Sequence, residues 1–162
     1  MSDTERMKQI ERYGNAYNML VAGLEQFPRE MWQYKPSPER WSIHEMLAHI
    51  ADSEANSYIR CRKLIAEPGT AITAYDENGW ATKLAYHEQS TDDALELFKW
   101  LRLKSYNLIR VLPESVWSHT IEHPENGTMA FDDWLGVYER HIPEHLAQMQ
   151  ENYQEWKQGV KQ

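Results

Sequence analysis

The segment from residue 131 to residue 156 most constrains what this chain can fold into. Its apolar and aromatic residues recur every three or four positions, as in a helix with one buried stripe: Phe131, Trp134, Leu135, Tyr138, Ile142, Leu146, Met149, Tyr153 and Trp156. His141 and His145 are four residues apart, so they project from the same side of this helix, one turn from each other. We expect both at the edge of the stripe and pointing inward, with Pro143 kinking the helix between them.

A pair of histidines at this spacing can bind one divalent ion. Taken alone, the pair can equally be two polar residues that are hydrogen-bonded at the edge of a helix. His119 and His123 repeat the spacing, but they lie in a stretch without helical periodicity that ends at Pro124, so we predict a loop there. We expect four histidines not to be metal ligands: His44, His87, His119 and His123.

Composition narrows the class of protein. With 162 residues, 41% of them hydrophobic, and with seven Trp and nine Tyr, the chain can bury a core, and we expect one domain over residues 1–162. The net charge of −8 argues against nucleic acid or an anionic membrane as a partner. The single cysteine, Cys61, favours a reducing, cytoplasmic location and a core role. We expect no signal peptide, because the first residues show no basic region followed by an apolar run, and no membrane span, because no 18-residue apolar stretch occurs.

Periodicity and capping residues predict an all-α chain with three further long helices. The first runs from about Thr4 to Gln26 and contains Gly14, which allows close packing. The second begins at the capping box formed by Ser42 and Glu45 and stops at Pro68-Gly69. The third is capped by Ser90 or Thr91 and ends before Pro113.

The connections between these helices are of unequal length. Residues 28–41 should lie against the bundle, and residues 69–90 form the longest connection, with a short helix around 77–86. That connection is either the rim of a site or a packed crossover. Residues 117–124 should be extended, with a turn at Glu125-Asn126-Gly127. The helices close most simply into an antiparallel four-helix bundle, although the connection lengths do not determine their order.

The second helix supplies a candidate third metal ligand. His49 lies at the edge of its apolar stripe, on the same flank as Glu45 and Asp52. Alone, this flank reads as solvated polar surface. A metal held by His141 and His145 needs a further ligand, and the 17 residues after His145 all belong to the same helix. The third ligand must therefore come from upstream, and His49 is the candidate.

Several motifs together resemble the DinB-like family over nearly the whole chain, to about Trp156. They are Trp41-Ser42-Ile43-His44-Glu45, then His49, then Asp52-Ser53-Glu54, and finally His141-Ile142-Pro143-Glu144-His145. The resemblance implies a four-helix bundle with a long connection between the second and third helices, a homodimer, and one divalent metal with His49, His141 and His145 as ligands. Members of this family include bacillithiol and mycothiol S-transferases, a thiol-dependent isomerase and proteins described as metal-dependent hydrolases.

Three neutral imidazoles leave the double charge of an ion uncompensated and coordination positions open, as in catalytic zinc sites. We expect zinc or nickel, although iron and copper also bind imidazole. Such a centre can activate water, or a low-molecular-weight thiol as cosubstrate, for attack on a small electrophilic substrate. Glu45, Asp52 and Glu144 are candidates for moving protons or orienting a ligand histidine, and their spacing does not choose among them.

Two other interpretations use the same residues. The sequence His141-x-x-Glu144-His145 matches the motif of inverted zinc proteases, with Glu144 as general base. Those enzymes are much larger and take a further ligand from a later helix, which this chain lacks. The second alternative is a non-catalytic metal-binding or dimerisation module, for which the many Trp and Tyr residues would form an interface. Turnover of thiols would favour an enzyme, whereas metal-dependent dimer affinity without turnover would favour the module.

Overall fold

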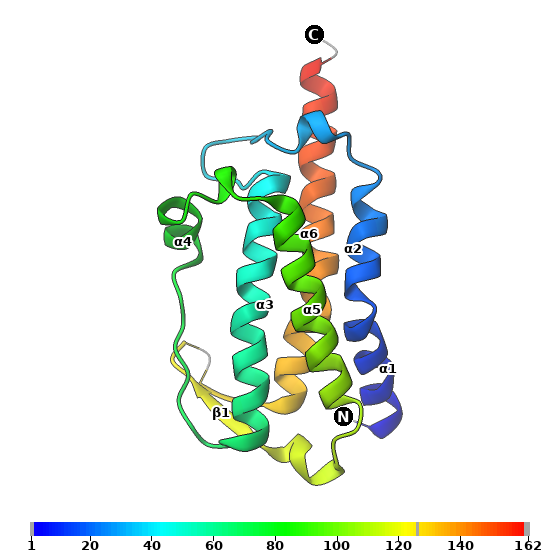
Figure 1. The fold of residues 1–162 in the computed structure, drawn as a ribbon, viewed down its shortest axis with the longest axis vertical. Coiled ribbons are helices and arrows are strands. Elements are labelled where there is room, and N and C mark those ends of the chain that lie inside the picture. Colours follow the sequence, from blue (N-terminus) through cyan, green and yellow to red (C-terminus); the bar gives the residue numbers. More distant parts are fainter. Residues whose placement is uncertain (1, 126, 161–162) are drawn as a thin grey trace.

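The computed structural model describes residues 2–125 and 127–160 and shows a four-helix bundle (Figure 1). The expected all-α class is confirmed. The long elements are α1 (Asp3–Gly14) continued by α2 (Ala16–Leu24), α3 (Ile43–Ala66), α5 (Thr91–Ile109) and α6 (Phe131–Val160). The short elements are η1 (Arg29–Met31), α4 (Glu77–Lys83), η2 (Tyr86–Glu88), η3 (Glu114–Ser118), β1 (Thr120–His123) and β2 (Gly127–Ala130).

The first of the four bundle positions is occupied by two consecutive helices, α1 and α2. The expectation of one continuous helix over residues 4–26 is therefore wrong, because the helix is interrupted at Asn15. The backbone there has φ −82° and ψ −1°, between the end of α1 and the start of α2. Two contacts from α5 meet the chain at the break. Arg102 donates a hydrogen bond of 3.2 Å to the Tyr13 carbonyl, which a regular helix would pair with the amide four residues later. A Cβ at Gly14 would lie 2.5 Å from the ring of Tyr106, so glycine allows this ring to approach.

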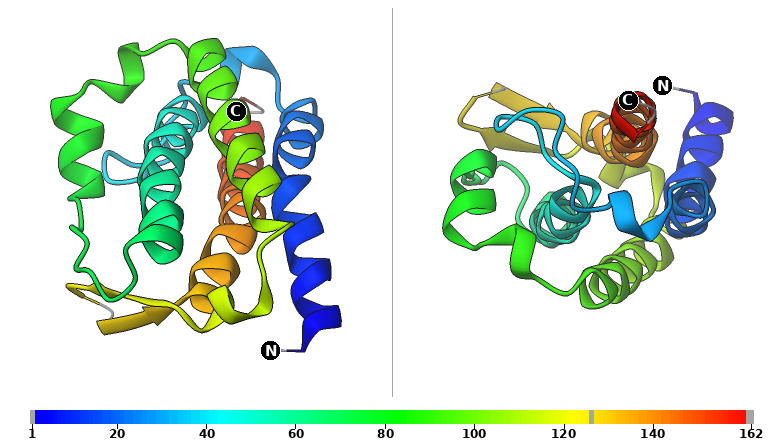
Figure 2. Two further views of the ribbon diagram at one scale, coloured as in Figure 1. Left: turned by 60° about the horizontal axis from the view of Figure 1, so that its bottom comes forward. Right: turned by 90° about the horizontal axis from the view of Figure 1, so that it is seen from above.

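Helices α3 and α5 run in the same direction, so the antiparallel expectation is wrong for this pair. The colours of Figure 1 show both helices descending from the same end of the bundle. The contacts agree, because Glu54 meets Arg102 and, further along both helices, Arg62 meets Ser105. The parallel arrangement is possible because the connection through α4 returns along the whole bundle before α5 begins. Seen from above, α4 lies beside α3 on the outside (Figure 2).

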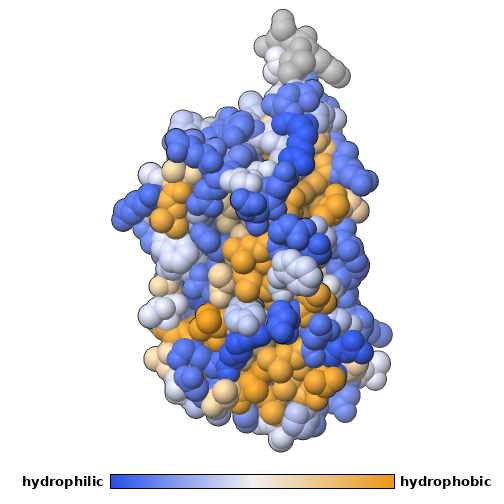
Figure 3. Space-filling model, viewed as in Figure 1, coloured by the Kyte–Doolittle hydropathy of each residue, from blue (hydrophilic) through white to orange (hydrophobic). Residues whose placement is uncertain are grey.

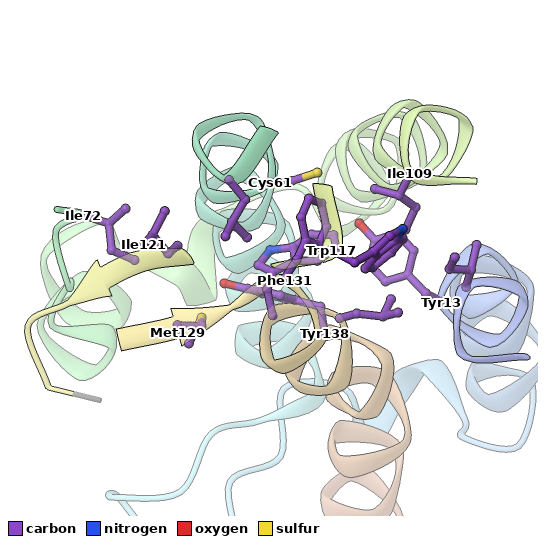
Figure 4. Packing of buried hydrophobic residues seen from close by; sticks show 13 residues of the cluster. Tyr13, Cys61, Ile72, Ile109, Trp117, Ile121, Met129, Phe131 and Tyr138 are labelled. Atoms are coloured by element: carbon purple, nitrogen blue, oxygen red, sulfur yellow. The ribbon is translucent and has the colours of Figure 1, made fainter. Parts of the chain in front are cut away.

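One end of the bundle is closed by the short β-hairpin. Strands β1 and β2 pair antiparallel, with Thr120 opposite Ala130 and His123 opposite Gly127. The turn predicted through Asn126 falls partly outside the described residues. The start of the long connection joins the hairpin through a hydrogen bond of 2.9 Å from the Ile72 amide to the Glu122 carbonyl. The hairpin packs against an aromatic cluster around Trp117, Phe131, Trp134 and Tyr13 (Figure 4 shows part of this packing).

A second apolar cluster fills the other end and sets the rotation of α6. Ile142 and Met149 of α6 are fully buried there with Leu47 of α3. Met31 and Trp32 are buried in the same cluster, so the connector over residues 28–41 lies against the bundle as expected. Helix α6 continues unbroken through Pro143. Because Ile142 faces the core, the histidines on either side of it are held at the boundary between core and surface.

The outer surface mixes polar and apolar residues. On the face that α3 and α5 present, hydrophilic side chains separate several smaller apolar patches (Figure 3). Within the part of the chain that the structure describes, no helix combines the length and the apolar character that crossing a bilayer requires.

Candidate metal centre

The rotation of α3 about its axis places His49 inside the bundle. The helix begins at a complete capping box, in which the Ser42 hydroxyl accepts from the Glu45 amide at 3.1 Å and the Glu45 carboxylate accepts from the Ser42 amide at 2.8 Å. Two turns later His49 is only 2% exposed. Its ring packs against Trp41, with 4.6 Å between the ring centroids. The cap and the indole together fix the position of this imidazole.

The three predicted histidines converge. His141 Nε2 lies 3.3 Å from His49 Nε2 and 3.0 Å from His145 Nε2. One ligand atom from each of the three rings lies within 4.8 Å of the others. Nitrogens bound to one tetrahedral ion at about 2.0–2.1 Å lie about 3.3 Å from each other. The two distances from His141 Nε2 therefore match the edge of such a coordination shell.

Hydrogen bonding at His145 also fits a bound cation. His145 Nδ1 lies 2.9 Å from the side-chain oxygen of Gln148, so Nδ1 carries the proton and Nε2 keeps a free lone pair. Three Nε2 atoms facing one another cannot all be paired by hydrogen bonds among themselves, whereas a shared cation can accept a lone pair from each. The Nδ1 atoms of His49 and His141 are buried without a hydrogen-bond partner among the described residues.

The electrostatics keep all three rings neutral at neutral pH. Burial, with a smaller contribution from the neighbouring His145, lowers the pKa of His49 to about 3. Burial also lowers the pKa of His141 well below its usual value, and that of His145 more moderately. A neutral imidazole is the form that binds metal, so protons compete weakly with an ion at this site.

A cavity of about 520 Å³, called the metal cavity below, opens beside the histidines. Its wall combines the three histidines with apolar groups of Trp41 and Met46 and a largely polar remainder: Glu39, Arg40, Glu77, Asn78, Glu144, Gln148, Glu151 and Asn152. Glu77 and Asn78 come from the long connection, which thus supplies part of the cavity wall. The volume is that of a pocket for a small molecule.

The three acidic candidates lie in different places. Glu144 lines the cavity with 63% of its side chain exposed, 3.6 Å from Arg140 Nε. Glu45 belongs to the helix cap and pairs with Lys35 at 2.9 Å; burial favours a higher pKa, but the Ser42 amide and Lys35 outweigh it and lower the pKa. Asp52 accepts a 2.6 Å hydrogen bond from the Tyr86 hydroxyl. Neither Glu45 nor Asp52 lines the metal cavity, so the proton-transfer role predicted from spacing has geometric support only at Glu144.

Sequence reasoning missed two residues of the site. Gln148 follows His145 by three positions, the spacing of helix neighbours, and this spacing is a signal that could have found it. Glu77 has no such relation to any histidine and reaches the cavity only through the path of the long connection. The other four histidines lie outside the cluster: His44 contacts the Gln89 carbonyl, His119 contacts the Leu64 carbonyl, and His87 is exposed. His123 accepts a hydrogen bond of 3.2 Å from the Glu125 amide and lines a smaller cavity that also borders His141.

The fold is a four-helix bundle with a candidate site for a metal ion, and comparison with known proteins gives its family. The model of the DinB superfamily matches residues 12–149, and the chain belongs to this superfamily.

Individual relatives carry similar descriptions. The chain is 33% identical over 107 residues to "Putative metal-dependent hydrolase OB0782" of Oceanobacillus iheyensis, covering 66% of this chain and 62% of that protein. It is 29% identical over 112 residues to "Putative metal-dependent hydrolase YfiT" of Bacillus subtilis, covering 68% of this chain and 63% of the relative. The matched segments thus span less than two thirds of these relatives.

A solved structure has the same fold. The YfiT structure, described as "a probable metal-dependent hydrolase with an unusual four-helix bundle topology", superposes with a TM-score of 0.88 over 97% of this chain and 90% of that chain, at 23% sequence identity. This likeness supports the bundle architecture of this chain.

Proposed function

We propose that this protein is a metal-dependent hydrolase that acts on a small electrophilic substrate. The observation that carries the proposal is the convergence of three neutral imidazoles, two of them buried and one half-buried, with Nε2 atoms 3.0 and 3.3 Å apart, on the wall of a 520 Å³ cavity. Similarity to relatives named as metal-dependent hydrolases supports it. Three protein ligands leave coordination positions open, which distinguishes catalytic from structural zinc sites.

In this proposal the residues of the chain have separate tasks. His49, His141 and His145 would hold a divalent ion, for which zinc and nickel are the leading candidates. When bound, the ion supplies Lewis acidity that activates water or a thiol and polarises the substrate. Gln148 orients the His145 ring through Nδ1, and Trp41 supports the His49 ring. The apolar surfaces of Trp41 and Met46 would position the substrate within reach of the histidines.

Thiol S-transfer is an alternative reaction at the same site. The family that the chain resembles includes S-transferases, and a thiolate can replace water as the nucleophile. A non-catalytic metal-binding module is the other alternative. The reaction decides between them: hydrolysis needs water alone, transfer needs an added thiol, and the module shows neither. The homodimer implied by the resemblance stays a prediction, which light scattering on the purified protein checks.

The test starts from protein purified without a nickel column and analysed for bound metals. Hydrolysis of p-nitrophenyl acetate is measured with metal-loaded protein, metal-stripped protein, a His145→Ala variant and a His87→Ala variant. We expect hydrolysis only with metal and only when His145 is present, while His87→Ala, which removes an exposed histidine, behaves as the parent protein. Conjugation of 1-chloro-2,4-dinitrobenzene with cysteine or glutathione, measured in parallel, identifies the S-transferase. Equal rates in all four preparations would remove the metal from the mechanism.

A further inference from the structure

Glu77 lies where two cavities meet. It is the first residue of α4, directly after Asp76, whose carboxylate caps the helix by accepting from the Gly79 amide at 2.9 Å. Its side chain lines the metal cavity and also a second cavity of about 210 Å³. His141 is the other residue shared by both walls. Glu77 therefore lies between the two cavities, together with the predicted metal ligand His141.

The other acidic residues of the metal cavity lack this position. Glu144 lies 3.6 Å from Arg140, and Glu151 lies 3.5 Å from Arg40, so both face a cation of their own. Glu39 also lines a different neighbouring cavity, whose wall includes Lys35. None of these three borders the smaller cavity behind His141.

The surroundings of Glu77 make its carboxyl group easy to protonate. Although part of the side chain is exposed, its partial burial raises the pKa above the usual value. Arg60 of α3 opposes this shift, Glu125 of the hairpin adds to it, and the Tyr75 hydroxyl opposes it. Further titratable groups line the smaller cavity on the remaining elements: His123 of β1, and Tyr138 and His141 of α6. A carboxyl group whose pKa lies closer to neutrality accepts and returns protons more readily at the working pH.

We propose that Glu77 is the proton-transfer residue of the metal cavity. This inference rests on the hydrolase function proposed above and assigns the base that spacing alone had sought in Glu45, Asp52 and Glu144. The Glu77 carboxylate removes one proton from the attacking water as the water oxygen forms a bond to the electrophilic carbon of the substrate. When the bond from that carbon to the leaving group breaks, Glu77 returns the proton to the leaving group, so the residue ends as it began.

The first test compares Glu77→Gln with Glu144→Gln and with Glu88→Gln, a matched change on the same connection at a residue outside the walls of both cavities. Metal content is measured for each, and all should bind as the parent does because none of these residues is a predicted ligand. For p-nitrophenyl acetate we expect Glu77→Gln to lower kcat by about 10²–10⁴-fold with little change in KM, and to remove the acidic limb of the pH profile. Loss of activity in Glu144→Gln with Glu77→Gln unaffected would overturn the proposal.

The second test needs no turnover. Acetohydroxamic acid is neutral near pH 7 and gives up a proton when it binds a metal, whereas azide is already an anion. With cobalt-loaded protein we expect Glu77→Gln to weaken acetohydroxamate binding by about tenfold or more, because in the parent the proton released by the hydroxamate stays on the Glu77 carboxylate and hydrogen-bonds the bound ligand. Azide releases no proton, so its binding should not change. Glu88→Gln should bind both ligands as the parent does.

The two tests separate failure of the function from failure of the inference. If the parent protein hydrolyses no ester but shows the hydroxamate difference, the hydrolase proposal fails for that substrate class while Glu77 remains the proton acceptor of the site. If acetohydroxamate binds equally to the parent and to Glu77→Gln, the assignment of Glu77 is overturned whatever the activity.

Discussion

At the scale of single residues, the pair formed by Glu54 and Arg102 is the main polar feature of the core. The side chains are 0% and 1% exposed and are joined by hydrogen bonds of 2.6 and 3.0 Å. Tyr13 donates to Glu54 at 3.0 Å, and Arg102 also donates to the carbonyls of Tyr13 and Tyr138. The network joins α1, α3, α5 and α6 just below the metal centre.

Removing one partner of this pair should destabilise the protein strongly. Arg102→Met leaves the Glu54 carboxylate buried without its countercharge, which costs about 3–5 kcal/mol. The double variant Glu54→Leu with Arg102→Met should lose less, because no uncompensated charge remains. Urea unfolding followed by circular dichroism measures both. A single variant as stable as the parent would show that the pair contributes little.

The histidine cluster predicts how the stability of the metal-free protein depends on pH. Burial lowers the pKa of His49 from 6.5 to about 3, so between these values the unfolded chain binds more protons than the folded one. The free energy of unfolding is therefore greatest above pH 6.5 and falls as the pH drops, by up to about 1.4 kcal/mol per pH unit for this residue.

The variant His49→Gln isolates this contribution, because glutamine does not titrate. Unfolding by urea in the presence of a chelator, repeated at several pH values between 7.5 and 4.5, should give a shallower slope for the variant than for the parent. Identical slopes would mean that His49 titrates normally in the folded state.

At the scale of elements, close approach of helices depends on glycine at a few contacts. At Gly14 a Cβ would meet the Tyr106 ring at 2.5 Å, and at Gly23 it would meet Leu146 at a distance that also requires movement. An aromatic ring in a packed interface cannot shift as a flexible chain end can. Close packing at Gly14 is expected from the sequence, and the structure confirms the contact with α5.

Gly14→Ala should therefore lower the free energy of unfolding by about 1–3 kcal/mol through overpacking, despite the better helix propensity of alanine. Gly159→Ala in α6 is the matched control, because nothing lies within 4 Å of its added Cβ. That variant should be neutral or gain up to about 1 kcal/mol. Thermal unfolding of the two variants checks the contrast, and equal effects would contradict the packing argument.

At the scale of the whole molecule, the histidine cluster joins α3 to α6, so an ion bound there should couple binding to folding. An ion that binds only the folded state raises the free energy of unfolding by about 2.7 kcal/mol at a free concentration of 100 times Kd. We expect zinc to raise Tm, a chelator to reverse the rise, and His49→Ala or His145→Ala to abolish it. His87→Ala should keep the full response. A rise of equal size in all variants would place the ion elsewhere.

Much of the fold followed from local sequence signals. The capping box at Ser42 and the cap at Ser90 start their helices where the pattern predicts, because capping depends on residues three apart. The apolar stripe of α6 likewise placed His141 and His145 on one side of one helix, because side-chain direction follows from helical periodicity. The family, its bundle architecture and the candidate ligands could all be predicted from the sequence.

Tertiary structure alone decided the features that depend on residues distant in sequence. The break at Asn15, the parallel direction of α3 and α5, the Glu54–Arg102 pair and the place of Glu77 beside His141 leave no periodic signal. Each depends on the path of a long connection or on a contact between separate helices, and the local propensities of the chain do not encode either one. The sequence by itself determined which side chains were available for a metal site, and the packing of the bundle decided which of them meet.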